Sequence, residues 1–533
     1  MTDTERAPIA GDPRDGASLW RTLAAAGPQA IAEALSAADF DRLHIAGRVD
    51  ELLAEAVGAG QSVVLTGNAG DGKTHLLRRM GSRLQNAVVV EDATALMRRD
   101  DPAPVLDLWR GALAAGRPFL IAANEYPLYQ LRRTGAGFGP IDEVSRQCRQ
   151  RLAYGAVMDD EAADGVLVVD LSLRNPLAAD MADVMLTAIL SDERLLAAIA
   201  TGTEPVARRN LELLSQPRVR ERLRTLLDRL IAVGERATVR ELWITLARMV
   251  FGRLGRGDFQ RADWYSEALF TRDQRFDLTT AIRRVDPAQS SHPLWDGILE
   301  ARALPIRSGW AVRAPAISPH PTLDWADFAA LKRRFYFEHE QGADAIALAD
   351  PDVIEFEQLL AGRRAGSSSL VGQLVDAINA AYCPVRFDAR DQHLYLWNGH
   401  RFHEQPSRSF VAADRVPTEQ LVLEVPRLPS RLNGWFDYRP DHVALSAPAI
   451  AGSPRLKIDF ALFQTLRRLE RGLPRKLVPE RDIHRVDAFI ERLGAGATGR
   501  RDVLWSVHLD SIELIQINYG EQGRRFESVR RYG

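Results

Sequence analysis

The sequence predicts an α/β fold in which a parallel sheet with helical crossovers is followed by helices and then by a mixed α+β C-terminal region. Short apolar runs alternate with helical pattern between about residues 43 and 175. Residues 176 to about 300 are almost wholly helical in period, and strand pattern returns in the last third of the chain. Unbroken β-branched runs bounded by Gly, Pro or Asn are typical of strands buried on both faces, as in a parallel sheet.

The composition is that of an ordinary globular protein. Of the 533 residues, 46% are hydrophobic and 26% are charged, which excludes a disordered or fibrous chain. Cys148 and Cys383 are too few for a disulfide framework or a structural zinc site. The N-terminus lacks the apolar core of a signal peptide, and no apolar run approaches the roughly 18 residues that cross a bilayer. We therefore expect a cytoplasmic protein that makes no membrane contact.

Five segments are expected along the chain. They are a disordered tail at 1–16, an α/β core at 17–175, a helical lid at 176–304, a helical connector at 305–370 and a strand-rich module at 371–533. The strands of the core are expected at 62–66, 87–92, 119–124 and 165–173. A Gly-Ser stretch at 361–369 indicates a flexible join, and Asn398-Gly399 between aromatic runs indicates a hairpin.

A glycine-rich motif lies between the first expected strand and the helix that follows it. Its residues are Gly67, Asn68, Ala69, Gly70, Asp71, Gly72, Lys73 and Thr74. They fit the pattern G-x-x-x-x-G-K-[ST], and the strand before and the helix after are the context that confirms a phosphate-binding loop. The glycines let the backbone wrap a phosphate, Lys73 reaches the β and γ phosphates, and Thr74 ligates Mg²⁺. We include His75, the next residue, in the predicted binding set, and prefer this interpretation to a glycine-rich turn that only caps a helix.

Hydrolysis of a bound nucleotide requires acid groups at the tip of a second strand, one to hold Mg²⁺ through water and one to orient or deprotonate the attacking water. Glu91 and Asp92 end the strand expected at 87–92 and supply both groups. If that strand is instead the edge strand, the strand at 119–124 takes its place and Glu125 becomes the catalytic acid. We favour the first arrangement because residues 87–92 closely follow the helix of the loop.

The segment from Leu43 to Thr74 resembles the start of the core of AAA+ and related STAND ATPases, where an adenine-contacting segment precedes an Arg-x-x-Glu-Leu-like helix. The corresponding residues here are Leu43–Ile45 for the adenine segment and Arg48, Glu51 and Leu52 for the helix. The resemblance implies a P-loop NTPase core with a helical lid, ATP and Mg²⁺ as ligands, and Ile45 at the adenine. The plainer alternative is an amphipathic helix that packs on the sheet.

The same resemblance implies roles for further residues. It makes the strand that ends at Asp92 the Walker B strand and Asn124 the sensor that positions water. Arg240, in the expected lid, resembles the sensor 2 arginine that points at the γ-phosphate. If the protein assembles into a homo-oligomeric ring, the candidates for trans arginine fingers are Arg132, Arg133 and Arg174. The alternative for each arginine is an ordinary solvated side chain.

Several segments occur in a family-like order over most of the chain. They read GNAGDGKTHLLRR, VVVEDA, IAANEYPLYQLRR, VVDLSLRNPL, TVRELW, DPAQSSHPLWD, KRRFYFEHE and LKIDFALFQTLRRLERG. This order resembles ATPases of bacterial anti-phage defence loci, in particular the DptF-like ATPases of phosphorothioation-dependent restriction. The resemblance implies an ATP-driven motor or switch that acts with separately encoded defence subunits on foreign DNA. A STAND-type signalling switch with a protein-sensing C-terminal region, and an AAA+ loader or remodeller of a protein complex, stay open as alternatives.

A net charge of −2 gives no sign of nucleic-acid binding by the whole molecule, so any DNA surface must be a local patch. Residues 332–337 place basic side chains beside aromatic ones, which suits phosphates and bases but also suits a helix with buried aromatics. A second basic concentration comprises Arg524, Arg525, Arg530 and Arg531. His400, His403 and Glu404 are a weak metal candidate, because the pattern offers neither a helix to hold the histidines nor a further ligand. A polar hairpin edge is the plainer interpretation.

Overall fold

The computed structural model describes most of the chain. The described residues are 16–25, 37–97, 101–154, 165–201, 204–252, 263–270, 277–300, 324–346, 351–363, 368–382, 392–397, 410–428, 438–496, 503–508, 511–520 and 523–532. The predicted tail up to residue 15, the predicted Asn398-Gly399 turn and the weak metal candidate at 400–404 lie outside them. The chain forms two compact units. The first contains Met1–Ile231, Glu235–Asp350 and Leu428–Arg439, and the second contains Ala232–Gly234, Pro351–Arg427 and Pro440–Gly533.

The first unit contains a parallel sheet of four strands, which confirms the predicted α/β class with a parallel sheet. The strands are β1 (Ser62–Thr66), β2 (Val88–Val90), β3 (Phe119–Ala122) and β4 (Val166–Asp170), in the order β2-β3-β1-β4. The two central strands and β4 are buried throughout. The β-branched runs were therefore a correct signal for strands covered on both faces.

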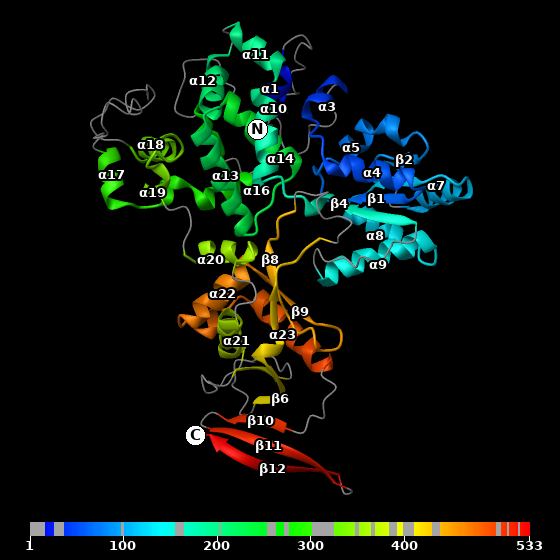
Figure 1. The fold of residues 1–533 in the computed structure, drawn as a ribbon, viewed down its shortest axis with the longest axis vertical. Coiled ribbons are helices and arrows are strands. Elements are labelled where there is room, and N and C mark those ends of the chain that lie inside the picture. Colours follow the sequence, from blue (N-terminus) through cyan, green and yellow to red (C-terminus); the bar gives the residue numbers. More distant parts are fainter. Residues whose placement is uncertain are drawn as a thin grey trace, which may run out of the picture. The chain divides into compact units, whose positions relative to one another are not determined.

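Helices cover both faces of this sheet (Figure 1). They are α4 (Arg48–Gly58), α5 (Lys73–Arg79), α6 (Ala93–Leu96), α7 (Ala103–Ala114), α8 (Glu125–Thr134) and α9 (Gly139–Tyr154). Val63 and Leu65 of β1 belong to a cluster with α4 and α5, whereas Val64 points to a cluster with α7, α8 and α9. This alternation of side chains along one strand joins two cores through a single sheet.

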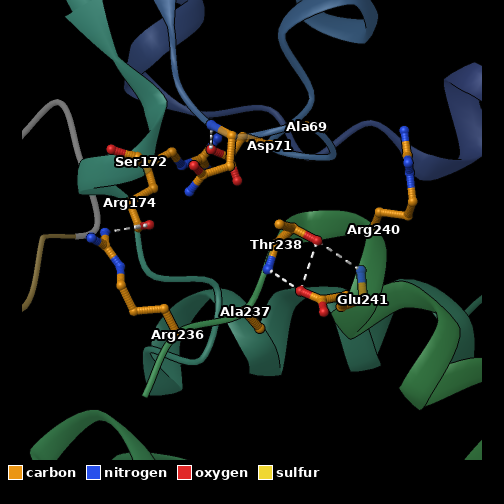
Figure 2. Close-up of a pocket in the computed structure, with 10 residues that line it drawn as sticks. Ala69, Asp71, Ser172, Arg174, Arg236, Ala237, Thr238, Arg240 and Glu241 are labelled. Carbon is orange, nitrogen blue, oxygen red and sulfur yellow. Dashed lines mark hydrogen bonds between the residues drawn. The ribbon is translucent and has the colours of Figure 1, made fainter. Parts of the chain in front are cut away.

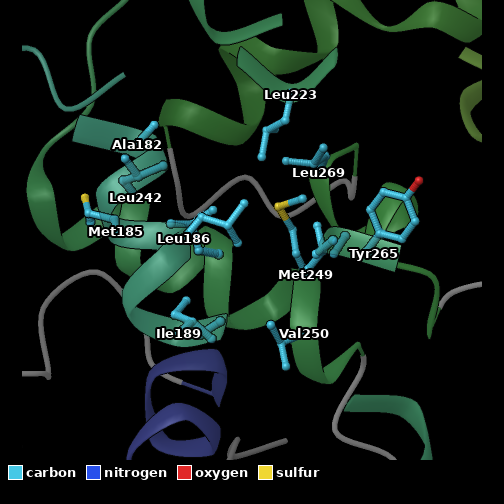
Figure 3. Packing of buried hydrophobic residues seen from close by; sticks show 14 of the residues in the cluster. Ala182, Met185, Leu186, Ile189, Leu223, Leu242, Met249, Val250, Tyr265 and Leu269 are labelled. Carbon is cyan, nitrogen blue, oxygen red and sulfur yellow. The ribbon is translucent and has the colours of Figure 1, made fainter. Parts of the chain in front are cut away.

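A long run of helices forms the rest of the first unit. They are α1 (Ser18–Ala25), α3 (Ala37–Leu43), α10 (Ala179–Leu190), α11 (Glu193–Ala200), α12 (Pro205–Leu214), α13 (Pro217–Ala232), α14 (Val239–Phe251), α15 (Tyr265–Leu269), α16 (Asp277–Ile282), α17 (Pro293–Glu300), α18 (Trp325–Glu338) and α19 (Gly342–Ala345). Most of them share one apolar cluster, in which Figure 3 shows Met185 and Ile189 of α10 with Leu242, Met249 and Val250 of α14. The predicted boundary between lid and connector stays a prediction, although α18 packs in this same cluster.

Helix α14 is the centre of that cluster, and its start follows from the sequence. Thr238 and Glu241 form a capping box, in which the Thr238 hydroxyl accepts the Glu241 N–H and the Glu241 carboxylate accepts the Thr238 N–H. Its end is fixed by Asn210 of α12, whose side chain is fully buried. The Asn210 amide donates to the carbonyls of Val250 and Asp263, and its oxygen accepts the Tyr265 N–H.

The basic and aromatic segment at 332–337 is an internal part of α18 and not a surface. Its aromatic side chains, Phe335, Tyr336 and Phe337, are at most 1% exposed. Its cations are paired within the unit, Lys332 with Asp296, Arg333 with Asp286 and Glu267, and Arg334 with Glu338. The suggestion that this segment binds nucleic acid is therefore wrong, because neither the rings nor the charges are presented to a ligand.

The second unit is mixed α+β, as predicted for the C-terminal region. Its helices are α20 (Pro351–Leu360), α21 (Ser368–Tyr382), α22 (Phe460–Glu470) and α23 (Glu480–Gly496). Its strands are β5 (His393–Trp397), β6 (Phe410–Pro417), β7 (Val422–Glu424), β8 (His442–Ser446), β9 (Arg455–Asp459), β10 (Val503–His508), β11 (Ser511–Gly520) and β12 (Gly523–Tyr532). They form two antiparallel sheets, β12-β11-β10-β6-β5 and β7-β8-β9. The arginines at 524, 525, 530 and 531 lie on β12, the last strand of the larger sheet.

The chain between β7 and β8 returns to the first unit. Leu428 is 8% exposed and belongs to the apolar cluster of β1, α4 and α5, and Tyr438 packs against the same cluster. Arg439 pairs with Asp180 of α10 at 3.4 Å. The core of the parallel sheet therefore includes side chains from the C-terminal half of the sequence.

Within the described part of the chain, no helix is both long enough and apolar enough to span a bilayer.

Replacement of Asn210 by Ala is expected to lower the free energy of unfolding by about 3 kcal/mol, because it leaves buried backbone groups of Val250, Asp263 and Tyr265 without their partner. Urea denaturation followed by tryptophan fluorescence measures the change. Arg208→Ala, on the exposed face of the same helix, is the control and is expected to change it by at most about 0.5 kcal/mol. Equal midpoints for the two variants would contradict this role of Asn210.

Candidate phosphate-binding site

The glycine-rich loop connects β1 to α5 by a path that only glycine adopts easily. The backbone φ angles are +139° at Gly67, +101° at Gly70 and +89° at Gly72. A Cβ added at Gly70 would lie 3.1 Å from the Thr238 hydroxyl oxygen, and one at Gly67 would lie 2.8 Å from a carboxylate oxygen of Asp71. Backbone conformation therefore favours glycine at all three positions, and close neighbours also exclude a side chain at Gly67 and Gly70.

Lys73 is the first residue of α5, and its side chain is folded back over the loop. The Nζ donates to the carbonyl oxygens of Gly67 at 2.9 Å and Asn68 at 2.6 Å. Burial lowers the pKa of Lys73, and the charges of Asp71, Asp170 and, more weakly, Asp92 oppose that shift. The Lys73 ammonium group is therefore a buried cation that lies against the loop backbone and interacts with the charges of Asp71, Asp170 and Asp92.

Asp71 lies inside the loop. Its Oδ2 accepts the backbone N–H of Asn68 at 2.6 Å, and its side chain is buried. Burial raises the pKa of the Asp71 carboxyl, and the Asn68 N–H and the charge of Lys73 counteract this. This hydrogen bond joins Asn68 and Asp71, two residues of the motif, across the turn of the loop.

The carboxyl end of β2 meets the first turn of α5. The Thr74 hydroxyl donates to the backbone oxygen of Glu91 at 3.2 Å. The Glu91 side chain is exposed and pairs with Arg78 at 2.8 Å, whereas the Asp92 carboxylate caps α6 by accepting the Thr94 N–H at 2.8 Å. The structure therefore brings the Thr74 hydroxyl to the backbone of Glu91 at the end of β2, next to Asp92 in the sequence.

The second candidate strand lies between the loop strand and β2. Asn124 follows β3 and is the N-cap of α8, and Glu125 is the exposed first residue of that helix. β2 is terminal in the described sheet, which is the arrangement that we associated with Glu125 as the acid, while the contact of Thr74 with Glu91 favours Asp92. The choice between these acids therefore stays a prediction.

A pocket of about 320 Å³ opens beside the loop (Figure 2). It is lined by Asn68, Ala69, Asp71, Ser172, Arg174, Arg236, Ala237, Thr238, Arg240 and Glu241. Figure 2 shows the loop on one side, the chain that follows β4 on another and the start of α14 on the third. Three arginines from two segments therefore surround a cavity that the loop helps to form.

Arg240 is fixed against the loop through its backbone. Its N–H donates to the Gly70 carbonyl at 3.2 Å, so that the first turn of α14 lies directly on the loop. Burial lowers the pKa of Arg240, and the charge of Arg240 in turn lowers that of Lys73. The structure thus places the predicted sensor arginine beside the loop, while its role there stays a prediction.

Sequence reasoning missed five residues that line the pocket, Ser172, Arg236, Ala237, Thr238 and Glu241, and also Asp170, whose charge acts on Lys73 and Asp71. Arg236 lines the pocket and donates to the Arg174 carbonyl at 3.5 Å, and Ser172 lines it after β4. Asp170 ends β4, is 3% exposed and accepts the Ser172 N–H at 2.9 Å. An apolar strand that ends in Asp was a usable signal for Asp170. The signal for Arg236 was its position four residues before the predicted sensor arginine, Arg240.

Ile45 and His75, predicted to bind the nucleotide, are not among the residues that line the pocket. Ile45 packs against the helical cluster of the first unit. The His75 ring stacks on His44, with centroids 5.6 Å apart, and lies 5.3 Å from the ring of Phe40 in α3. Burial is the main cause that lowers the pKa of His75 to about 4. The described contacts of His75 therefore join α5 to α3.

The remaining candidate arginines occupy different surroundings. Arg132 is half-buried and donates to the Ser145 hydroxyl at 3.3 Å, and Arg133 is exposed on α8. Arg174 lines the pocket. Whether any of them acts on a second copy of the chain stays a prediction.

Comparison of the chain with protein-family models, with curated proteins and with solved structures finds no match.

The loop geometry predicts a graded loss of stability for alanine substitutions. Gly72→Ala is expected to lower the free energy of unfolding by about 1–2 kcal/mol because of its positive φ, and Gly70→Ala by about 2–4 kcal/mol because Thr238 and Arg240 also obstruct a Cβ. Gly58→Ala, in α4 with open space around it, is the control and is expected to stabilise by up to about 1 kcal/mol. Chemical denaturation measures all three, and a Gly70 variant as stable as the Gly58 variant would refute the described path of the loop.

Proposed function

We propose that the chain binds ATP with Mg²⁺ at the loop Gly67–Thr74 and hydrolyses it. The observation that carries this proposal is the position of the Lys73 ammonium over a glycine turn at the start of α5, with Thr74 beside the end of β2. Backbone N–H groups of such a turn and the positive end of the helix attract phosphate. Lys73 donates to two loop carbonyls, and phosphate oxygens would take over these hydrogen bonds.

Thr74 and Asp92 fit a magnesium site. Both offer the oxygen donors that Mg²⁺ prefers, and the bond between Thr74 and Glu91 brings the end of β2 to the hydroxyl. When bound, Mg²⁺ neutralises charge on the phosphate oxygens. Asn124 and the acid at the strand end then orient the attacking water and take its proton, with Asp92 or Glu125 as that acid.

The arginine-lined pocket supports a nucleotide whose phosphate chain extends past the loop. Arg174, Arg236 and Arg240 approach the loop from the end of β4 and the start of α14. Guanidinium groups pair with phosphate oxygens in a planar fork, and in a low-dielectric site they stabilise transition-state charge. Because Arg240 is also tied to Gly70, the helical part of the first unit is in direct contact with the loop, as an ATPase of AAA+ or STAND type requires.

We place this activity in a bacterial anti-phage DNA restriction system, as a motor or switch subunit that works with separately encoded partners. The support is the order of sequence motifs, of which the loop is the most specific. A STAND-type switch is the second candidate, because most of the C-terminal part of the chain folds as a compact unit of its own. Turnover that duplex DNA stimulates at least about fivefold supports the motor, whereas slow turnover with one tightly bound nucleotide per chain supports the switch.

Three substitutions test the chemistry. Lys73→Ala is expected to abolish nucleotide binding, and Asp92→Asn to keep binding while lowering turnover by about 10²–10⁴-fold, the usual worth of a general base. Glu125→Gln is expected to change turnover by less than about threefold on the same scale. Phosphate release and calorimetric titration give the two readouts. Lys457→Ala, on an exposed strand position of the second unit, is the matched control.

Full turnover in Asp92→Asn together with its loss in Glu125→Gln would assign the acid to β3 and not to β2. Nucleotide binding by Lys73→Ala at wild-type strength would show that the loop is only a structural turn.

A further inference from the structure

The proposed reaction leaves one buried ionisable group of the loop without a role. Asp71 is 7% exposed and lies within the phosphate-binding motif, where a fixed negative charge opposes the ligand. Its Oδ2 accepts the Asn68 N–H at 2.6 Å, so the carboxylate is held in place and cannot swing into solvent without breaking that bond. It also forms part of the pocket wall beside Arg240.

The charges around Asp71 are close to balanced before any ligand arrives. Lys73 interacts electrostatically with both Asp71 and Asp170, and these two carboxylates are each less than 10% exposed. Arg236 contributes a further attractive charge to Asp71, and Asp170 a repulsive one. The attraction of Lys73 for a phosphate group is therefore reduced by the nearby negative charges of Asp71 and Asp170.

Burial increases the interaction energies between these charges. Coulomb energies between charges a few ångströms apart are several times larger at a partly buried site than in water, and they scale with the charge of the incoming ligand. Free ATP carries about four negative charges and free ADP about three, whereas the magnesium complex of ATP carries about two, so the same carboxylate opposes them to different degrees.

We propose that Asp71 is a specificity-determining positioning residue, whose hydrogen bond to Asn68 shapes the loop and whose charge makes the loop select magnesium-bound nucleotide over free nucleotide. This inference rests on the proposed function. It assigns to Asp71 a role that the backbone N–H groups and Lys73 do not supply, because they attract phosphate whether or not Mg²⁺ is bound to it. Thr74 would favour the magnesium complex through its hydroxyl oxygen and not through charge.

Asp71→Asn separates the two contributions. The amide keeps an oxygen that accepts the Asn68 N–H, while the charge is lost. Asp71→Ala loses both the charge and the acceptor. Asp107→Asn is the matched control, because it removes the same charge from an exposed position on α7.

The experiment titrates the full chain by calorimetry with ATP in Mg²⁺, ATP in EDTA and ADP in EDTA. Asp71→Asn is expected to bind free ATP about tenfold more tightly than the wild type does, free ADP about fivefold and the magnesium complex about threefold, in the order of ligand charge. Asp107→Asn is expected to match the wild type within about twofold for all three ligands, because its charge is exposed and screened.

A gain that is equal for the three ligands, or a uniform loss of affinity, would overturn the proposal and leave Asp71 as a structural cap of the loop. If Asp71→Asn does not fold, Asp71→Ala and the wild type alone still decide. A wild type that binds free ATP as tightly as the magnesium complex contradicts selection by charge. A wild type that binds no nucleotide in any condition overturns the proposed ATPase function as well, so the two failures are distinguishable.

Discussion

Burial of the parallel sheet on both faces is the constraint from which the candidate site follows. β1, β3 and β4 carry apolar side chains to two separate cores, and no polar group is placed along their length except at the ends. Parallel strands bring their carboxyl ends to one edge. The glycine loop, Asp92, Asn124 and Asp170 all follow strand ends, so the fold alone gathers them at that edge.

The loop is connected to the helices of the first unit by its backbone as well as by neighbouring charges. The bond from the Arg240 N–H to the Gly70 carbonyl, and the close approach of Thr238 to Gly70, leave no room for the loop to move independently of α14. The capping box holds the start of α14 rigid, and the large apolar cluster holds the rest of the helix. The position of the loop is therefore coupled directly to that of α14.

Local signals in the sequence predicted local structure well. The β-branched runs predicted the four strands of the sheet, and the G-x-x-x-x-G-K-[ST] pattern predicted a tight glycine-rich turn between a strand and a helix. Strand order was not predictable, because β2 reaches the edge only through pairing with β3, about thirty residues further along the chain. The neighbours of individual side chains were even harder to predict from the sequence. Lys332 and Arg333 resembled part of a nucleic-acid surface because their acidic partners, Asp296, Asp286 and Glu267, lie far away in the sequence. Asp170 was overlooked because its importance comes from its electrostatic interaction with Lys73.

The return of residues 428–439 to the first unit has a consequence for how this protein can be divided. Leu428 and Tyr438 complete the apolar core under β1 and α5, yet they belong to the connection between two strands of the second unit. A protein cut after Asp350 would retain every residue of the glycine loop and lose part of the floor beneath it, leaving apolar surface exposed to water. The two units pack separately, but residues that complete the core of the first unit lie, in the sequence, between two strands of the second. A fragment that ends at that boundary would therefore lack part of the apolar core that supports the glycine loop.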